Sequence, residues 1–179
     1  MEACHVKCSD AIAKFLANHV RHAFVVSGGA NLHILHSISA TPGIDFICMQ
    51  HEQACGFAAD AYARLHGLGC SIATSGPGFT NGLTPMAASY YDSIPVLFIC
   101  GQVTISRLGV GWGARQVGFQ QTPAIEVASP ICKYAAEPLR AEDVMPAMRE
   151  AVRIAREGRP GPVLVSIPDD VQRIDVQSL

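Results

Sequence analysis

The chain has 179 residues, of which 49% are hydrophobic and 16% are charged, so the composition predicts a globular domain with a sizeable core and excludes a disordered chain. The formal net charge of −2 argues against nucleic acid or an anionic membrane as a partner. No apolar run approaches the length of a membrane span and the N-terminus carries no signal-peptide pattern, so we expect a cytoplasmic protein with no membrane partner.

Helix-like and strand-like segments alternate along the chain. Helices are predicted over residues 9–20, 31–37, 52–66, 80–91 and 141–157. Short strands are predicted over residues 23–26, 44–49, 71–74, 95–100 and 162–167. Because the strands are continuous hydrophobic runs, we expect an α/β fold, a doubly wound parallel sheet with helices on both faces. Residues 1–172 are the predicted domain, and residues 173–179 are predicted to start a linker or tail.

Glycine and polar residues follow each predicted strand. They occupy residues 27–30, 50–52, 75–78 and 101–102. The carboxyl ends of parallel strands meet at one edge of a sheet, where ligands of such folds bind. The sequence therefore predicts a ligand site at this edge. Residues 101–130 form a long irregular connection around the only tryptophan, Trp112, and a loop of this length is usually functional or mobile.

Glu52 is the first candidate for a functional side chain. It begins a predicted helix whose next residues are small, including Ala54, Gly56 and Ala59. A helix face with so little bulk lets a backbone or a flat ligand approach closely. A carboxylate in the first helical turn also suits the positive end of the helix dipole. From position alone, an ordinary helix-terminal charge is the simpler interpretation.

Metal and redox sites are not indicated. His51 and Glu52 begin like a zinc-protease signature, but residue 55 is Cys where the second zinc-binding His is needed. His33 and His36 have helical spacing but no apparent carboxylate partner, so we interpret them as surface or half-buried histidines. The seven cysteines are scattered, and none forms a C-x-x-C pair.

The glycine loop at residues 75–78 leaves two interpretations open. It lies between a predicted strand and a predicted helix, where a phosphate-binding loop would lie. The dinucleotide fingerprint needs a glycine at position 81, which is Asn81, and no P-loop lysine is present. The loop is either a tight turn that brings the helix close to the sheet or a site that binds through backbone groups.

Several separate motifs agree with one family. They are HEQACGFAADAYAR from residue 51, ATSGPGFTNG from 73, YDSIPV from 91, GQV from 101, FQ from 119, GRPGPV from 158 and PDDVQ from 168. In this order they resemble the N-terminal, pyrimidine-binding domain of thiamine-diphosphate enzymes. Within that family they are most similar to the acetolactate synthase group of 2-oxo acid decarboxylases and carboligases. The resemblance covers nearly the whole chain.

The resemblance implies roles for individual residues. Glu52 matches the catalytic glutamate that hydrogen-bonds ring nitrogen N1′ of the cofactor. Sharing a proton there favours the imino tautomer of the 4′-amino group, whose nitrogen then takes the proton from thiazolium C2. The implied cofactor-binding residues are Gly28, Gly29, Ala30, Glu52, Thr74, Pro77, Asn81 and Gln120.

Two departures from the family pattern set limits. The Gly-Asp-Gly segment and following Asn that hold Mg²⁺ and the diphosphate lie on a separate domain in the family, and this sequence contains no such segment. We therefore expect a fragment or one subunit of a split enzyme, inactive alone, with Mg²⁺ bound only through a domain absent from this chain. The insert around Trp112, with Arg107 and Arg115, departs from the usual pattern, so the 2-oxo acid substrate and the binding of FAD stay open.

The predicted helices 52–66 and 80–91 carry more apolar surface than one small sheet needs for its own cover. In the resembling family these helices pair about a two-fold axis, so we expect a homodimer in which each Glu52 reaches the cofactor held by the partner's other domain. Two further hypotheses remain, a nucleotide- or flavin-binding module and a non-catalytic regulatory subunit of the same fold.

Overall fold

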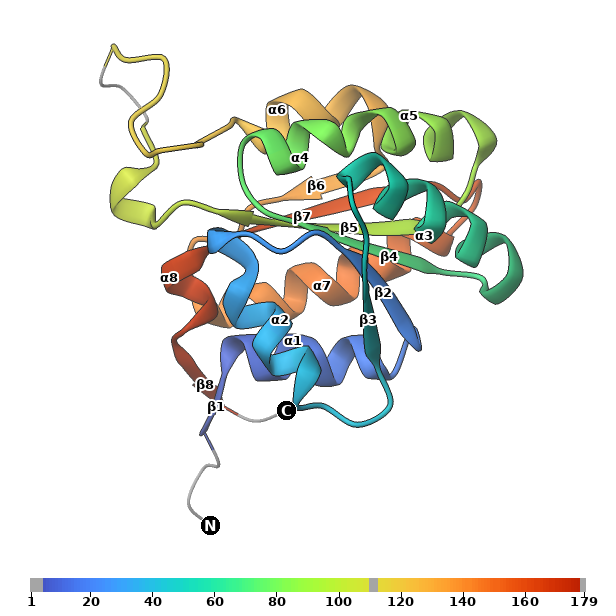
Figure 1. The fold of residues 1–179 in the computed structure, drawn as a ribbon, viewed down its shortest axis with the longest axis horizontal. Helices are drawn as coiled ribbons and strands as arrows, with labels where there is room; N and C mark the ends of the chain where they lie inside the picture. Colours follow the sequence, from blue (N-terminus) through green and yellow to red (C-terminus); the bar gives the residue numbers. More distant parts are fainter. Residues whose placement is uncertain (1–4, 110–112, 178–179) are drawn as a thin grey trace.

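The computed structural model describes residues 5–109 and 113–177, and in it a parallel sheet lies between two layers of helices (Figure 1). The six strands of this sheet are β2 (His22–Val25), β3 (Asp45–Cys48), β4 (Gly69–Ala73), β5 (Val96–Gln102), β6 (Tyr134–Ala136) and β7 (Val163–Pro168). Their spatial order is β3-β2-β4-β5-β7-β6, and every pairing is parallel. The predicted doubly wound α/β fold is confirmed. Trp112 and Gly111 lie outside the described residues.

Helices cover both faces of the sheet. One face carries α1 (Cys8–Ala17), α2 (Leu32–Ser39) and α7 (Ala141–Arg156). The other face carries α3 (Glu52–His66), α4 (Pro77–Asn81), α5 (Leu83–Asp92) and α6 (Ala124–Ala128). The short helix α8 (Asp169–Gln172) follows β7 and contacts α1 and α2. In the described part of the chain, no helix combines the length and the apolar composition that crossing a membrane would need.

Each layer has its own hydrophobic core. The larger core lies under α1, α2 and α7, where Val144, Met148 and Ala151 are fully buried at helical spacing. The smaller core lies under α3, α5 and α6 and includes Phe79 and Phe98. Burying one large apolar side chain contributes roughly 1.5–3 kcal/mol, so these two cores account for the stability of the layered arrangement.

The small residues of α3 are used within the chain. A side chain at Gly56 would overlap the Pro85 ring of α5, and one at Gly69 would overlap the carbonyl group of Ala59. Glycine and alanine therefore bring α3 into close contact with α5 on one side and with β4 on the other. The larger side chains of α3, Phe57 and Leu65, are instead exposed.

The structure differs from the predicted elements in three places. Residues 80–91 were expected as one helix, but the chain forms α4 and α5 with Gly82 between them. The connection 101–130, expected to be irregular, contains α6 and the short 3-10 helices η2 (Ile105–Arg107) and η3 (Ser129–Ile131). α6 forms because Ala124 and Ala128 are buried in the smaller core. β6 was not predicted, since its residues show no distinct apolar run.

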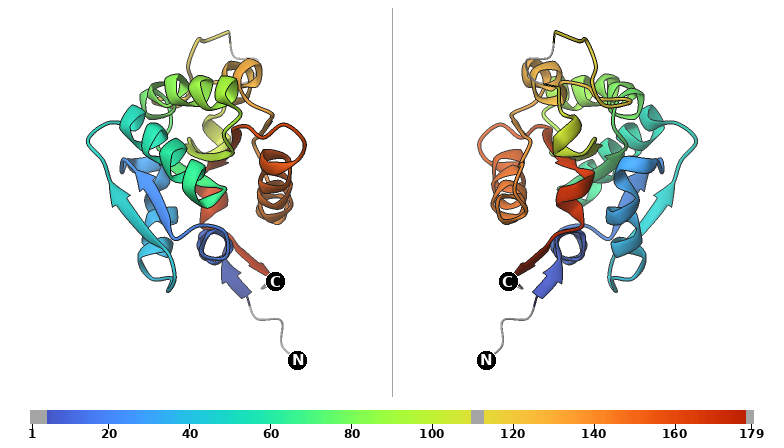
Figure 2. Two further views of the ribbon diagram at one scale, coloured as in Figure 1. Left: turned by 90° about the vertical axis from the view of Figure 1, so that its right-hand side faces the viewer. Right: turned by 90° about the vertical axis from the view of Figure 1, so that its left-hand side faces the viewer.

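A small second sheet joins the two ends of the described chain. β1 (His5–Lys7) pairs antiparallel with β8 (Asp175–Gln177), and the two strands lie apart from the main sheet (Figure 2). β8 lies within the segment expected to start a linker or tail. Backbone pairing between distant residues orders this segment, and no local sequence signal announces it. The domain limit at residue 172 stays a prediction.

The contact between α3 and α5 yields a stability prediction. Gly56→Ala should lower the free energy of unfolding by about 1–3 kcal/mol, because the new methyl group overlaps Pro85 and the helices must separate. In an open helix the same change would instead stabilise by about 1 kcal/mol. Urea denaturation measures the difference. Ala61→Ser, at an exposed position of the same helix, is the control and should change stability by less than about 0.5 kcal/mol. A stabilised Gly56→Ala variant would contradict the close packing.

Candidate functional site

The candidate site lies where the chain reverses its direction across the sheet. β2 leads through α2 to β3 on one side, whereas the return through α3 brings β4 to the other side of β2. Connections that diverge in this way leave a crevice at the carboxyl ends of the two strands. The turn after β2 and the loop after β4 meet there, and the backbone N–H of Ala30 donates a hydrogen bond to Thr74 Oγ1 at 3.2 Å.

Glycines let three backbone segments close around Thr74. A Cβ at Gly28 would lie 2.5 Å from Thr74 Cβ, and a Cβ at Gly78 would lie 2.7 Å from Thr74 Cγ2. Separations this short are not tolerated between real side-chain atoms. The glycines of the two predicted binding loops are therefore required first for packing against Thr74. Gly29, by contrast, has open space where a Cβ would stand.

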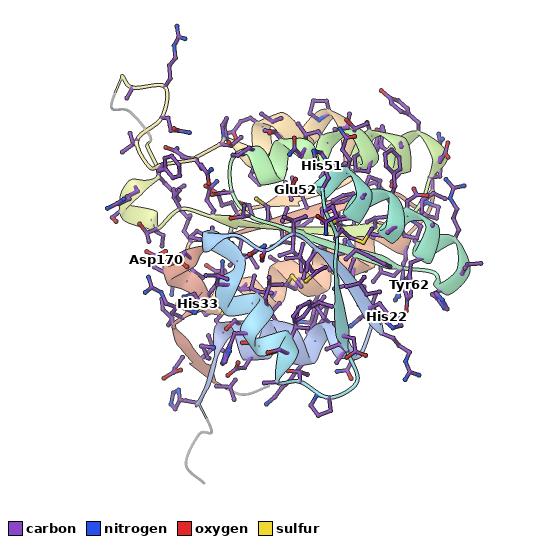
Figure 3. The ribbon with its side chains drawn as sticks, in the orientation of Figure 1. His22, His33, His51, Glu52, Tyr62 and Asp170 are labelled. Carbon is purple, nitrogen blue, oxygen red and sulfur yellow. The ribbon has the colours of Figure 1, made fainter. Side chains whose placement is uncertain are left out.

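Glu52 begins α3, beside the carboxyl end of β3, as the sequence predicts (Figure 3). His51 is the residue that caps the helix, and its Nδ1 accepts a hydrogen bond from the backbone N–H of Gln53 at 3.1 Å. The Glu52 residue is only 9% exposed. The side chain of Asn81, at the end of α4, donates from Nδ2 to Glu52 Oε2 at 2.9 Å. The loop between β4 and α5 thus orients the carboxylate.

The second oxygen of Glu52 is available to another group. Oε1 has no hydrogen-bond partner among the described residues, although a Cβ at Gly78 would lie 3.3 Å from it. Among the described residues, Gln172 Oε1 is the single side-chain atom that is both buried and without a hydrogen-bond partner. Since Glu52 Oε1 also has no partner, it must keep some contact with solvent. One turn further along α3, burial and, to a smaller extent, the charge of Glu52 together raise the pKa of the Cys55 thiol to about 12. Cys55 is therefore a neutral apolar neighbour of the carboxylate.

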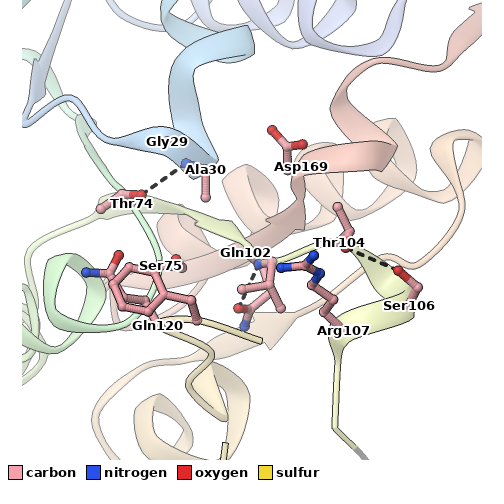
Figure 4. A pocket seen from close by; sticks show the side chains of 12 residues that line it. Gly29, Ala30, Thr74, Ser75, Gln102, Thr104, Ser106, Arg107, Gln120 and Asp169 are labelled. Carbon is pink, nitrogen blue, oxygen red and sulfur yellow. Dashed lines mark hydrogen bonds between the residues drawn. The ribbon is translucent and has the colours of Figure 1, made fainter. Parts of the chain in front are cut away.

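A cavity of 660 Å³ opens on the other side of Thr74 (Figure 4). Its lining residues are Gly29, Ala30, Thr74, Ser75, Gln102, Val103, Thr104, Ser106, Arg107, Phe119, Gln120 and Asp169. Gln120 has a left-handed backbone, with φ of 63°, and its carbonyl oxygen would lie 2.6 Å from a Cβ at Gly76. A non-glycine residue in this conformation costs about 1–3 kcal/mol and persists where surrounding contacts enforce it.

The structure divides the predicted site residues into two neighbouring groups. Gly29, Ala30, Thr74 and Gln120 line the cavity. Glu52 and Asn81 form the hydrogen-bonded pair outside it, and Gly28 and Pro77 do not line it either. The carboxylate and this cavity therefore do not coincide in the single chain, and Thr74 and the glycine loop lie between them. The carboxylate is the stronger candidate for a catalytic group, because it is buried and a specific donor, Asn81, orients it.

Sequence reasoning did not assign four of the twelve lining residues to the site. Ser106 and Arg107 come from η2, Thr104 immediately precedes it, and Asp169 comes from the start of α8. The sequence signal for this part of the site was that residues 101–102 follow a predicted strand. No local pattern indicates that residues 107 and 169 line the same cavity. Within the described ranges, no cluster of three or more His, Cys, Asp or Glu residues could hold a metal ion.

Comparison with known proteins gives concordant results. The profile of the family described as thiamine pyrophosphate enzyme, N-terminal TPP binding domain, matches residues 6–127. Acetolactate synthase 2, chloroplastic, of Zea mays is 40% identical over 93% of this chain. The acetolactate synthase large subunits of Buchnera aphidicola and Haemophilus influenzae are 37% and 40% identical over 91% and 84% of it. The matched region is 26%, 28% and 26% of these relatives, so the chain spans about a quarter of their length.

The hydrogen bond between Asn81 and Glu52 can be measured by a double-mutant cycle. Asn81→Ala, Glu52→Ala and the double variant should give a coupling energy of about 1–2 kcal/mol in urea denaturation. Each single variant already removes the part-buried hydrogen bond, so the double variant should lose less stability than the sum of the two single variants. Thr80→Ala, at the exposed residue beside Asn81, is the control for the first change and should show no coupling to Glu52. A coupling energy near zero for Asn81 would show that the amide does not orient the carboxylate.

Proposed function

The chain belongs to the family of thiamine pyrophosphate enzyme N-terminal domains, and on this basis we propose that it acts in an acetolactate-synthase-like decarboxylation and carboligation of 2-oxo acids. In this proposal it is the pyrimidine-binding domain or subunit. Thiamine pyrophosphate, also called thiamine diphosphate, is the cofactor. Since the relatives are about four times as long as the matched region, the complete reaction needs parts that this chain does not supply.

One observation carries the proposal. A carboxylate that is 9% exposed stands at a helix N-terminus, with one oxygen held by Asn81 and the other without a partner among the described residues. A partly desolvated acid with a free oxygen can share a proton with a ring nitrogen placed against it. An ordinary helix-terminal charge would need neither burial nor a dedicated amide donor.

The residues present fit the pyrimidine end of thiamine diphosphate. Glu52 Oε1 would meet ring nitrogen N1′. The backbone of Gly28 to Ala30, together with Thr74, Pro77, Asn81 and Gln120, would surround the ring, where small side chains and open space at Gly29 leave room. In the proposal Mg²⁺ and the diphosphate are bound by another domain, and FAD is assigned no residue of this chain.

The protein groups have separate tasks. When bound, thiamine diphosphate supplies a carbon nucleophile that adds to the 2-oxo acid and accepts electrons as carbon dioxide leaves. Glu52 holds and releases a proton at Oε1, which changes the protonation of the amino group across the ring. Asn81 fixes the carboxylate, so that its free oxygen is directed at the ring. The closed backbone around Thr74 limits the entry of water from the direction of the sheet.

Glu52 can be tested apart from turnover. In the full-length protein, or in this chain combined with a diphosphate-binding domain, Glu52→Gln should slow hydrogen–deuterium exchange at C2 of bound thiamine diphosphate by about 10²–10⁴-fold. Quenched-flow NMR of the cofactor measures this rate. Glu142→Gln is the matched control, because Glu142 also lies in the first turn of a helix but is exposed.

Three outcomes would count against the assignment. Unchanged exchange in Glu52→Gln would remove the catalytic role of this residue. Undiminished turnover in Glu52→Gln together with undetectable cofactor binding in the parent would favour a regulatory subunit. Tight binding of a flavin or nucleotide in place of thiamine diphosphate would favour the binding module. The cytoplasmic location stays a prediction, and the relatives include chloroplastic enzymes.

We also propose a homodimer that pairs α3 and α5. Exposed apolar side chains gather on these two helices, namely Phe57, Leu65, Tyr90 and Tyr91, which are 46%, 82%, 38% and 69% exposed. They flank the small residues, which are already used to pack α3 inside the chain. A two-fold contact through this face would cover the large side chains and close the side of the site where Glu52 keeps solvent contact.

Sedimentation at tens of micromolar tests the dimer. The parent should sediment as a dimer, and Phe57→Arg with Leu65→Arg should sediment as a monomer, because charges would be buried without partners. The control is Leu139→Arg, at a residue that is 48% exposed and far along the chain from α3 and α5. A monomeric parent would refute the dimer, and a dimeric double variant would place the contact elsewhere.

A further inference from the structure

The part of the cavity formed by Thr104, Ser106 and Arg107 has no role in the function proposed above. Arg107 is exposed on η2 and lines the cavity, and its side chain extends from this turn toward the other lining residues (Figure 4). It forms no ion pair with any Asp or Glu of the described chain, whereas Arg64 and Arg153 each pair with two and Arg140 and Arg173 each pair with one. A guanidinium at a cavity wall without an acidic partner is suited to bind an anion.

η2 holds Arg107 in a defined place. Both carboxylate oxygens of Asp170 accept from the backbone N–H of Ile105, at 3.2 and 3.1 Å. The backbone N–H of Arg107 donates to the Thr104 carbonyl at 2.8 Å. The turn also lies close to Gly118, where a Cβ would stand 3.0 Å from Arg107 Cβ. Anchoring at α8 and at Gly118 reduces the conformational entropy that a ligand-bound Arg107 would lose.

The other polar groups of the cavity leave Arg107 as its uncompensated charge. Asp169 forms an ion pair with Arg173, whose Nη2 lies 3.0 Å from Oδ2, and His33 Nε2 lies 3.6 Å from Oδ1. The amide of Gln102 is occupied on both sides, since Nε2 donates to Thr122 and Glu137 and Oε1 accepts from Val103. Thr104 and Ser106 add hydroxyl groups, which lie 3.3 Å apart. One of these hydroxyl groups donates to the other, so an anion would meet one guanidinium and one free hydroxyl donor of the pair.

We propose that Arg107 binds the carboxylate of the 2-oxo acid, with Thr104 and Ser106 beside it, in the part of the cavity opposite Gly29 and Ala30. This inference rests on the proposed function, which assigns the Gly29 side of the same cavity to the cofactor ring. A planar guanidinium pairs with a carboxylate through two parallel hydrogen bonds. A single cation with one free hydroxyl donor matches a monoanion, whereas a phosphate dianion usually recruits more positive charge. A small acid fits the 660 Å³ available alongside the ring.

Equilibrium dialysis with radiolabelled oxamate tests the inference in the full-length protein. Oxamate has the shape and charge of a short 2-oxo acid but does not react, and oxamide is its neutral counterpart. Arg107→Gln should weaken oxamate binding at least 10-fold, or about 1.4 kcal/mol. The oxamate affinity of Arg107→Lys should lie between those of the parent and of Arg107→Gln, because lysine keeps the charge and loses the paired hydrogen-bond geometry. Arg115→Gln, an exposed arginine of the same connection that does not line the cavity, should stay within twofold of the parent.

The inference is overturned by any of four results: no oxamate binding by the parent, an Arg107→Gln variant within twofold of it, an equal loss in Arg115→Gln, or an equal loss of oxamide binding. Failure of the proposed function looks different. If oxamate binding depends on Arg107 but the C2 hydrogen–deuterium exchange rate of the cofactor is unchanged in Glu52→Gln, the anion subsite alone is supported. If the C2 exchange rate falls in Glu52→Gln but oxamate affinity is unchanged in Arg107→Gln, the cofactor site alone is supported.

Discussion

The contact of Thr74 with two glycine-bearing turns holds the candidate site together. Thr74 leaves the end of β4 and occupies the space that side chains at Gly28 and Gly78 would need. Its hydroxyl accepts the Ala30 N–H, so the turn after β2 is tied to the strand beside it. Because Gly78 also approaches Glu52, the position of one threonine sets the distance between the carboxylate and the cavity. Any larger residue at either glycine would push these parts away from one another.

The turn at Ala30 is held from a second direction by the end of the described chain. Gln172 is fully buried, and its Nε2 donates to the carbonyl groups of Ala30 at 2.8 Å and Ile167 at 2.9 Å. Its Oε1 is buried without a partner, which costs about 1–3 kcal/mol. Gly101 lies so close to the Ala30 carbonyl that no side chain fits there. The ends of β5 and β7 thus stabilise the turn that lines the cavity.

A polar network fixes α3, the helix that carries Glu52. Asp60, which is 6% exposed, accepts from Ser89 Oγ and Arg64 Nε at 2.7 Å each. Arg64 also donates to Asp92 at 2.7 Å, so two residues in the C-terminal part of α5 are tied to α3. Both oxygens of this buried carboxylate accept hydrogen bonds, which offset the cost of its burial and resist sliding of one helix along the other. The first turn of α3 is therefore presented by a helix that cannot easily shift.

From sequence alone, the parallel sheet, most helices, the start of α3 at Glu52 and the gathering of binding loops at one sheet edge could be predicted. These features depend on local signals, since continuous apolar runs form buried strands and a capped helix begins where such a run ends. The Asn81–Glu52 hydrogen bond, the β1–β8 pairing and the presence of Arg107 and Asp169 in the wall of one cavity could not. Each joins residues far apart in the sequence. Such contacts form only once the strand order brings them together, and short segments such as β6 and α6 are ordered by the neighbours that bury them.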